Sequence, residues 1–222
     1  MAERRVRTNM KRFVRFGFAA LALAALGASL RVPGRADGDL LARMGRINPH
    51  LKSYTADVHA DISMRTFPYL SPSLDGTYYH KEPNKDKLIF TSGLPVIAKQ
   101  FSKIYPHLES PARWNAVYVV TVVGDEGGFT TLKLVPRKTG RVEHIDAKVD
   151  DRRATVVQMR WNYADGGGYA TLDQQYTAYR GNMLVSRQSG HVEIPNYAGD
   201  VKSTFGNFKL NARIPDSLFA GE

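Results

Sequence analysis

An unbroken alternation of apolar and polar side chains over residues 54–65 is the strongest constraint on what this chain can fold into. The apolar positions are Tyr54, Ala56, Val58, Ala60, Ile62 and Met64. The residues between them are polar or charged, so a period of two places the two sets on opposite faces of an extended segment. The pattern predicts one long strand with a buried face and a face in water.

Similar segments follow, separated by turn sequences rich in Gly, Pro, Asn and Asp. They predict nine further strands at 76–81, 87–91, 116–123, 129–135, 142–149, 154–161, 169–179, 183–194 and 200–210. Helical spacing of apolar residues predicts short helices over 39–52 and 94–105, and residues 67–72 read as an apolar loop broken by prolines. We therefore expect a mainly β domain with a few helices, built as an antiparallel meander over residues 37–222.

The first 36 residues have the composition of a signal peptide. Basic residues fill the stretch before Phe16, and the run from Gly17 to Leu30 is apolar except for Ser29. Small residues at Gly34 and Ala36 suit cleavage before Asp37. An uncleaved membrane anchor is the alternative, although a spanning helix needs roughly 20 apolar residues and this run is shorter. Cleavage would deliver residues 37–222 to the periplasm.

The net charge of +10 suggests a nucleic-acid partner until its position is considered. Residues 1–36 hold eight of the 31 basic residues and one of the 21 acidic residues, so the remainder carries 23 basic against 20 acidic residues, a net +3. We therefore expect no nucleic-acid binding. The chain has no cysteine, which excludes disulfides, thiolate metal sites and a lipid-modified N-terminal Cys.

Motifs for catalysis or cofactor binding are missing from the sequence. It contains no GxSxG elbow, no P-loop and no GxGxxG, and its six histidines do not have the spacing of metal ligands. Asp57, His59 and Asp61 share one strand face and could bind a cation, but a solvated face is the favoured interpretation. We predict no catalytic residue, no metal and no cofactor.

Several short motifs follow one another along the chain: a signal peptide, a short helix, a long first strand that begins at Ser53, the segment Gly76-x-Tyr78 with 81–85 (KEPNK), and a closing pattern at 208–219 with Ile214-Pro215-Asp216. In this order they resemble the LolA/LolB-like superfamily of periplasmic lipoprotein and lipid carriers. The likeness spans residues 39–219. One departure lies beyond Pro83, where these carriers usually have an arginine linked to holding the lid and this chain has Lys85 and Lys87.

The resemblance implies an unclosed antiparallel half-barrel with a helical lid and an apolar cavity for the acyl chains of a lipid or lipoprotein. It also implies a loading transporter in the inner membrane and an acceptor at the outer membrane, and we expect a monomer. Together with the strand pattern it selects as cavity wall Ile62, Met64, Phe90, Leu132, Leu134 and Met159. The lid candidates are Phe67, Tyr69, Val96, Ile97 and Phe101.

Two alternatives remain open at this point. The apolar faces of the strands fill either a packed core or a ligand cavity, and composition alone does not separate them. A sensor or binding domain of the same fold that recognises a protein partner is the alternative to a carrier.

Overall fold

The alternating segment forms strand β1 (Ser53–Met64), and its apolar residues are buried along one face. The structure, a computed structural model, describes residues 38–67, 69–82, 84–91 and 110–220. The remaining strands are β2 (Ser73–Lys81), β3 (Lys85–Phe90), β4 (Tyr118–Glu126), β5 (Phe129–Pro136), β6 (Val142–Asp150), β7 (Thr155–Tyr163), β8 (Tyr169–Tyr179), β9 (Asn182–Ile194) and β10 (Tyr197–Leu210). Short helical segments are α1 (Gly38–Met44), η1 (Pro111–Arg113), α3 (Trp114–Val117) and η2 (Asp216–Phe219).

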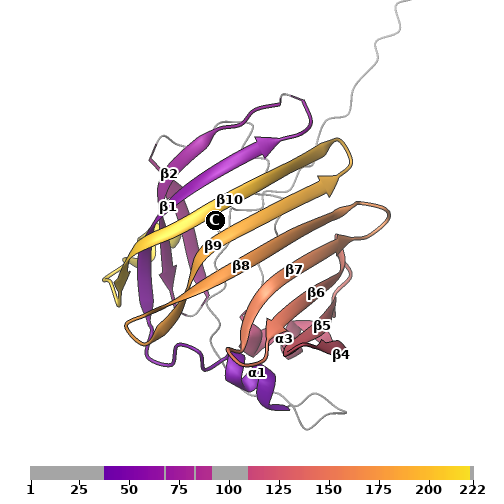
Figure 1. Ribbon diagram of the computed structural model, residues 1–222, viewed down its shortest axis with the longest axis horizontal. Coiled ribbons are helices and arrows are strands. Elements are labelled where there is room, and N and C mark those ends of the chain that lie inside the picture. The colour runs from indigo at the N-terminus through magenta and orange to yellow at the C-terminus, as the bar shows by residue number, and fades with distance from the viewer. Residues whose placement is uncertain (1–37, 68, 83, 92–109, 221–222) are drawn as a thin grey trace, which may run out of the picture.

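The ten strands form one curved antiparallel sheet in the order β3-β2-β1-β10-β9-β8-β7-β6-β5-β4 (Figure 1). Each neighbouring pair is a hairpin partner in sequence except β1 and β10, which pair from Tyr54 with Leu210 to Met64 with Gly199. The sheet ends at β3 on one side and β4 on the other, so it is not closed. The predicted unclosed antiparallel half-barrel is confirmed.

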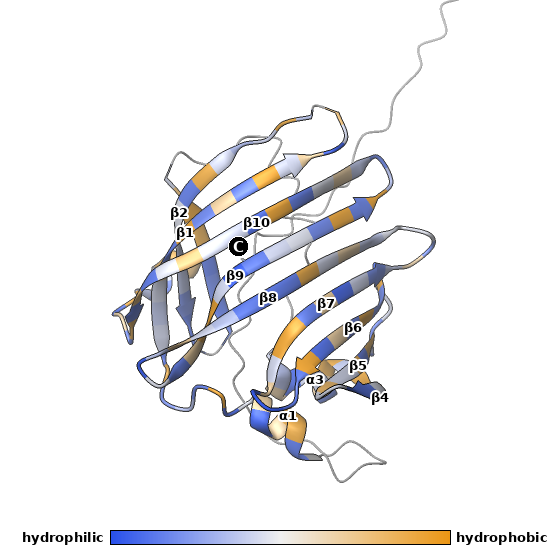
Figure 2. Cartoon of the chain, in the orientation of Figure 1, coloured by the Kyte–Doolittle hydropathy of each residue, from blue (hydrophilic) through white to orange (hydrophobic). Residues whose placement is uncertain are grey.

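Apolar residues gather on one side of the sheet, which we call the inner face. Hydrophobic and hydrophilic positions alternate along the strands (Figure 2). The larger cluster joins β1–β9 to the apolar side of α1 and to Trp114. The smaller cluster lies on β1, β2 and β9 and includes Tyr54, Val58 and Tyr78. Burial of these faces supplies the main driving force for folding.

The helix predicted over 39–52 ends at Met44, so its second half was wrong. Leu40, Leu41 and Met44 are buried as the spacing predicted. The helix stops before Gly45, a poor helix former. Beyond it, the buried Asn48 side chain donates to the Met183 carbonyl at 2.9 Å and accepts from the Met183 N–H at 2.8 Å. Both bonds tie this segment to β9 in an irregular conformation that a helix would break.

The strand predicted from residue 116 begins at Tyr118. Residues Trp114–Val117 form one helical turn instead, and Trp114 is fully buried in the larger cluster. Burying the Trp114 indole stabilises this helical turn by more than the following residues would gain from joining the strand. The helix predicted over 94–105 lies outside the described residues.

Candidate ligand-binding face

The six predicted wall residues come together on the inner face. Ile62 and Met64 lie on β1, Phe90 on β3, Leu132 and Leu134 on β5, and Met159 on β7. All six are buried and belong to the larger cluster. Strand order in a curved sheet brings these segments together although they are far apart in sequence. A packed core and a cavity wall would both bury these residues in one cluster, so their contact with a ligand stays a prediction.

Two of the five predicted lid residues are described, and both face solvent. Phe67 is 85% exposed and Tyr69 is 69% exposed in the loop between β1 and β2. The Tyr69 N–H donates to the Thr66 carbonyl in a tight turn, and Tyr69 has a φ of 55°. In this conformation neither side chain covers the larger cluster. Val96, Ile97 and Phe101 lie outside the described residues.

A buried charged group lies beside the smaller cluster. The His80 ring is 1% exposed, and its two nitrogens lie 2.7 Å from Asp86 Oδ1 and 2.8 Å from Glu82 Oε1. The Tyr78 hydroxyl also donates to Asp86. Burial acts to lower the pKa of His80, but the hydrogen bonds to Asp86 and Glu82 outweigh it and raise the pKa to about 9. His80 is therefore a cation at neutral pH, with both ring N–H groups donating.

Two of the motifs that carry the sequence resemblance meet in space, which sequence reasoning missed. Asp216 of the closing pattern accepts from Lys85 at 2.6 Å and lies 3.2 Å from Lys81 Nζ. Lys81 also donates to the Ile214 carbonyl, and Lys87 donates to the Leu218 carbonyl. The lysines found where carriers usually have an arginine thus hold the C-terminal segment against β2 and β3.

The outer strand face around His59 behaves as a solvated surface. His59 Nδ1 lies 2.8 Å from Asp75 Oδ1, and Ser73 bridges His59 and Asp61. The hydrogen bond to Asp75 raises the pKa of His59. In the part of the chain that the structure describes, no group of three His, Cys, Asp or Glu side chains is placed to hold a metal ion.

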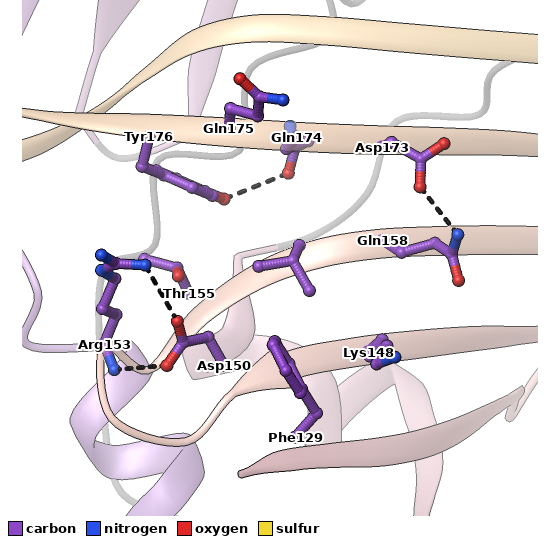
Figure 3. A pocket seen from close by; sticks show the side chains of 11 residues that line it. Phe129, Lys148, Asp150, Arg153, Thr155, Gln158, Asp173, Gln174, Gln175 and Tyr176 are labelled. Carbon is purple, nitrogen blue, oxygen red and sulfur yellow. Dashed lines mark hydrogen bonds and ion pairs between the residues drawn. The ribbon is translucent and has the colours of Figure 1, made fainter. Parts of the chain in front are cut away.

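The sheet opens between β7 and β8. Their pairing runs from Asn162 with Tyr169 to Gln158 with Asp173 and then stops, while β8 continues beside β9. The opening is a pocket of about 440 Å³ (Figure 3). Across it, the Tyr176 hydroxyl donates to the Val156 carbonyl at 2.9 Å. The Tyr176 side chain thus links the two strands where backbone pairs are missing.

A row of buried polar side chains crosses the inner face next to this opening. It consists of Gln174 on β8, Gln188 on β9 and Ser203 on β10, each directly opposite the next in the strand register. Sequence reasoning did not single out these residues. The available signal was the appearance of glutamine at positions that period two assigns to the buried face.

Comparison with known proteins shows which solved structures share this fold. No family model matches the sequence, and no curated protein matches it. Several solved structures match the fold, among them a DUF1329 family protein from Desulfovibrio piger (10% identity, TM-score 0.62, 82% of this chain and 95% of that chain). A LolA superfamily protein from Nitrosomonas europaea matches with a TM-score of 0.58 over 84% and 98% of the two chains. The chain has the LolA-like fold.

A third structure with the LolA-like fold is described as an outer membrane lipoprotein-sorting protein domain from Vibrio parahaemolyticus. It matches with a TM-score of 0.60 over 80% of this chain and 93% of that chain. Its 10% identity, like that of the other two, establishes the fold alone. The fold expected from the short sequence motifs is thus confirmed. Within the described residues, no helix is long and apolar enough to cross a membrane.

Proposed function

We propose that this protein is a periplasmic carrier that buries the acyl chains of a lipid or lipoprotein against the inner face of its sheet. The supporting observation is the larger cluster, which gathers the six wall residues on an unclosed LolA-like sheet. Each CH₂ moved out of water contributes about 0.8 kcal/mol, so acyl chains bind there without specific bonds. Transfer then needs binding and release, and no covalent chemistry.

The inner-face wall is tested by a polar substitution. Leu132→Gln, Leu134→Gln and Met159→Gln each place an amide in the larger cluster. If the face holds a ligand, the variants should lose bound lipid while their melting temperature stays close to that of the wild type, because the amide meets water or lipid space. Native mass spectrometry of the freshly purified exported protein and thermal unfolding are measured on the same samples.

Lys133→Gln is the matched control, because Lys133 alternates with Leu132 and Leu134 on β5 and lies on the outer face. It should alter neither lipid content nor melting. A packed core would respond differently to the wall variants, since an unsatisfied buried amide costs about 1–3 kcal/mol. The carrier function would be contradicted if the melting temperature fell sharply in all three variants and the wild-type protein contained no lipid.

Export to the periplasm rests on residues 1–36. We expect the signal to be removed before Asp37, because small residues stand at Gly34 and Ala36 after a basic and an apolar segment. N-terminal sequencing of the periplasmic protein should begin at or near Asp37. Recovery of the full-length chain only in the membrane fraction would favour an anchored protein instead.

One observation favours a second function, recognition of a protein partner. Phe67, Tyr69 and Leu70 expose apolar surface together at one end of the sheet. Solvent-exposed apolar groups of this kind mark interaction sites. A partner-binding domain would purify without lipid and would lose capture of its partner after Phe67→Ser and Tyr69→Ser, whereas a carrier would keep its lipid.

A further inference from the structure

The polar row on the inner face interrupts an otherwise apolar surface. Gln174 and Gln188 are direct partners across β8 and β9, and Gln188 and Ser203 across β9 and β10. Strand alternation puts Gln174 on the same side as Leu172, and Gln188 on the same side as Val192, both members of the larger cluster. The two amides therefore face the interior of the half-barrel.

Three of the four polar atoms of these amides are buried without a hydrogen-bond partner. Gln174 and Gln188 are each 4% exposed. Among the described residues, Nε2 of Gln174 and both Nε2 and Oε1 of Gln188 have no partner. Buried side-chain amides are almost always satisfied in folded proteins, because an unmade hydrogen bond costs stability. Two adjacent exceptions on one face indicate that another polar group completes them.

The row also marks the border between the two hydrophobic clusters. On β1, Ala60 belongs to the larger cluster and Val58 to the smaller one. Ser203 lies directly opposite Ala60, and Phe205, which packs on the smaller cluster, lies opposite Val58. A ligand that extends over both clusters must therefore place its middle against the polar row.

The opening between β7 and β8 reaches the same row. Gln174 and Tyr176 both line that pocket, and the Tyr176 hydroxyl lies 3.1 Å from Gln174 Oε1 (Figure 3). Lys148, Gln158 and Asp173 line the pocket too, beside the apolar Phe129 and Val157, so further polar groups lie near the row. The polar row thus continues toward the polar surface of the sheet.

We propose that Gln188 and Gln174 bind the carbonyl group of an acyl linkage, with apolar parts of the ligand on the two clusters. This inference rests on the proposed carrier function. An amide Nε2 donates to an ester or amide carbonyl, and Gln188 Oε1 can accept from the N–H of an amide linkage. Such a site distinguishes acylated ligands from hydrocarbon of equal length, which an apolar wall does not.

The test uses matched phospholipids that share a headgroup and hexadecyl-length chains and differ only in an ester, amide or ether linkage. The exported protein is incubated with vesicles of each lipid, and the lipid retained is quantified by mass spectrometry. We expect the wild type to retain the ester and amide lipids about three- to tenfold more tightly than the ether lipid, the range for one net hydrogen bond. Preference for amide over ester would indicate N-acylated ligands, and the reverse order glycerolipids.

Gln188→Met and Gln174→Met replace the amides by apolar groups of similar shape. We expect each variant to bring the carbonyl-to-ether ratio toward one, with an unchanged or higher melting temperature of the lipid-free protein, because an unsatisfied amide is removed. Arg187→Met is the matched control, because Arg187 is exposed next to Gln188 on β9 and belongs to neither cluster, so the ratio should stay at the wild-type value.

Equal retention of the three lipids by the wild type would overturn this inference and leave the carrier function standing. Retention of none would overturn the carrier function itself. A ratio unchanged in Gln188→Met together with a lower melting temperature would show that the amides are structural and would also overturn the inference. The wild-type ratio is decisive even if a variant fails to fold.

Discussion

At the scale of single residues, His80 is a buried histidine whose pKa is raised by its two carboxylate neighbours. It is enclosed between Asp86 and Glu82 next to Tyr54, whose ring centroid lies 5.2 Å from that of His80. A buried cation is stable only when it is paired and hydrogen-bonded, and here both ring nitrogens are occupied. The histidine thus joins β2 to β3 by charge-assisted bonds that depend on its protonation.

Protonation of His80 makes stability depend on pH. Its pKa is about 9 in the folded protein and about 6.5 in an unfolded chain. Below about pH 6.5 both states are protonated and the stabilisation is complete. Between about 6.5 and 9 only the folded state keeps the proton, so the free energy of unfolding should fall, by on the order of 3 kcal/mol in total.

Urea unfolding from about pH 6 to 9.5 measures this slope. His80→Gln should unfold with a much flatter dependence, and His50→Gln, which changes an exposed histidine, should keep the wild-type slope. Equal slopes in the wild type and His80→Gln would show that His80 is not the titrating group.

At the scale of elements, the hairpin turns decide how the strands join. The β8–β9 turn has Arg180 at φ 47° and Gly181 at φ 78°, the two positive values of a type I′ turn. Before β8, Gly168 has φ 82°, and a Cβ there would lie 2.0 Å from the Glu193 carbonyl oxygen. Both glycines need the left-handed region, but only Gly168 also lies against a neighbouring backbone.

This difference predicts unequal effects of the same substitution. Gly181→Ala meets nothing within 4 Å and should cost about 1–2 kcal/mol from backbone strain alone. Gly168→Ala must also push β9 away and should cost clearly more than the 1–3 kcal/mol that strain typically accounts for. Chemical denaturation of both variants gives the comparison. Equal losses of unfolding free energy in the two variants would mean that β9 can move away from the new Cβ at Glu193 without destabilising the protein.

At the scale of the whole molecule, the sheet depends on pairing between the first and last strands. β1 and β10 pair along almost their full length, and without that pairing the β1–β3 hairpins would be separate from the β4–β10 meander. A three-stranded sheet and a meander with a free edge each expose apolar faces and unpaired backbone groups. We therefore expect the described strands to unfold together in one cooperative transition.

Two truncations test this dependence. Ending the chain after Ile194 removes β10 and should abolish cooperative thermal unfolding, with aggregation through exposed edges. Ending it after Leu210 removes η2 and the acceptors of Lys81, Lys85 and Lys87 but keeps β10. The protein that ends after Leu210 should still unfold cooperatively, but at a lower temperature than the full-length protein. Cooperative unfolding of the first truncation would contradict the role of β10.

The sequence by itself determined ten strands close to their observed positions and the buried face of β1, because period-two alternation and turn glycines act within a few neighbouring residues. It also selected wall residues that the fold brings into one cluster. A meander alone does not give the pairing of β1 with β10, which the tertiary structure decided. Tertiary structure alone decided where α1 ends, because Asn48 bonds to Met183 across the molecule. It alone also decided the meeting of Lys85 with Asp216 and the alignment of Gln174 with Gln188. These contacts depend on register between distant strands, which a local pattern does not encode.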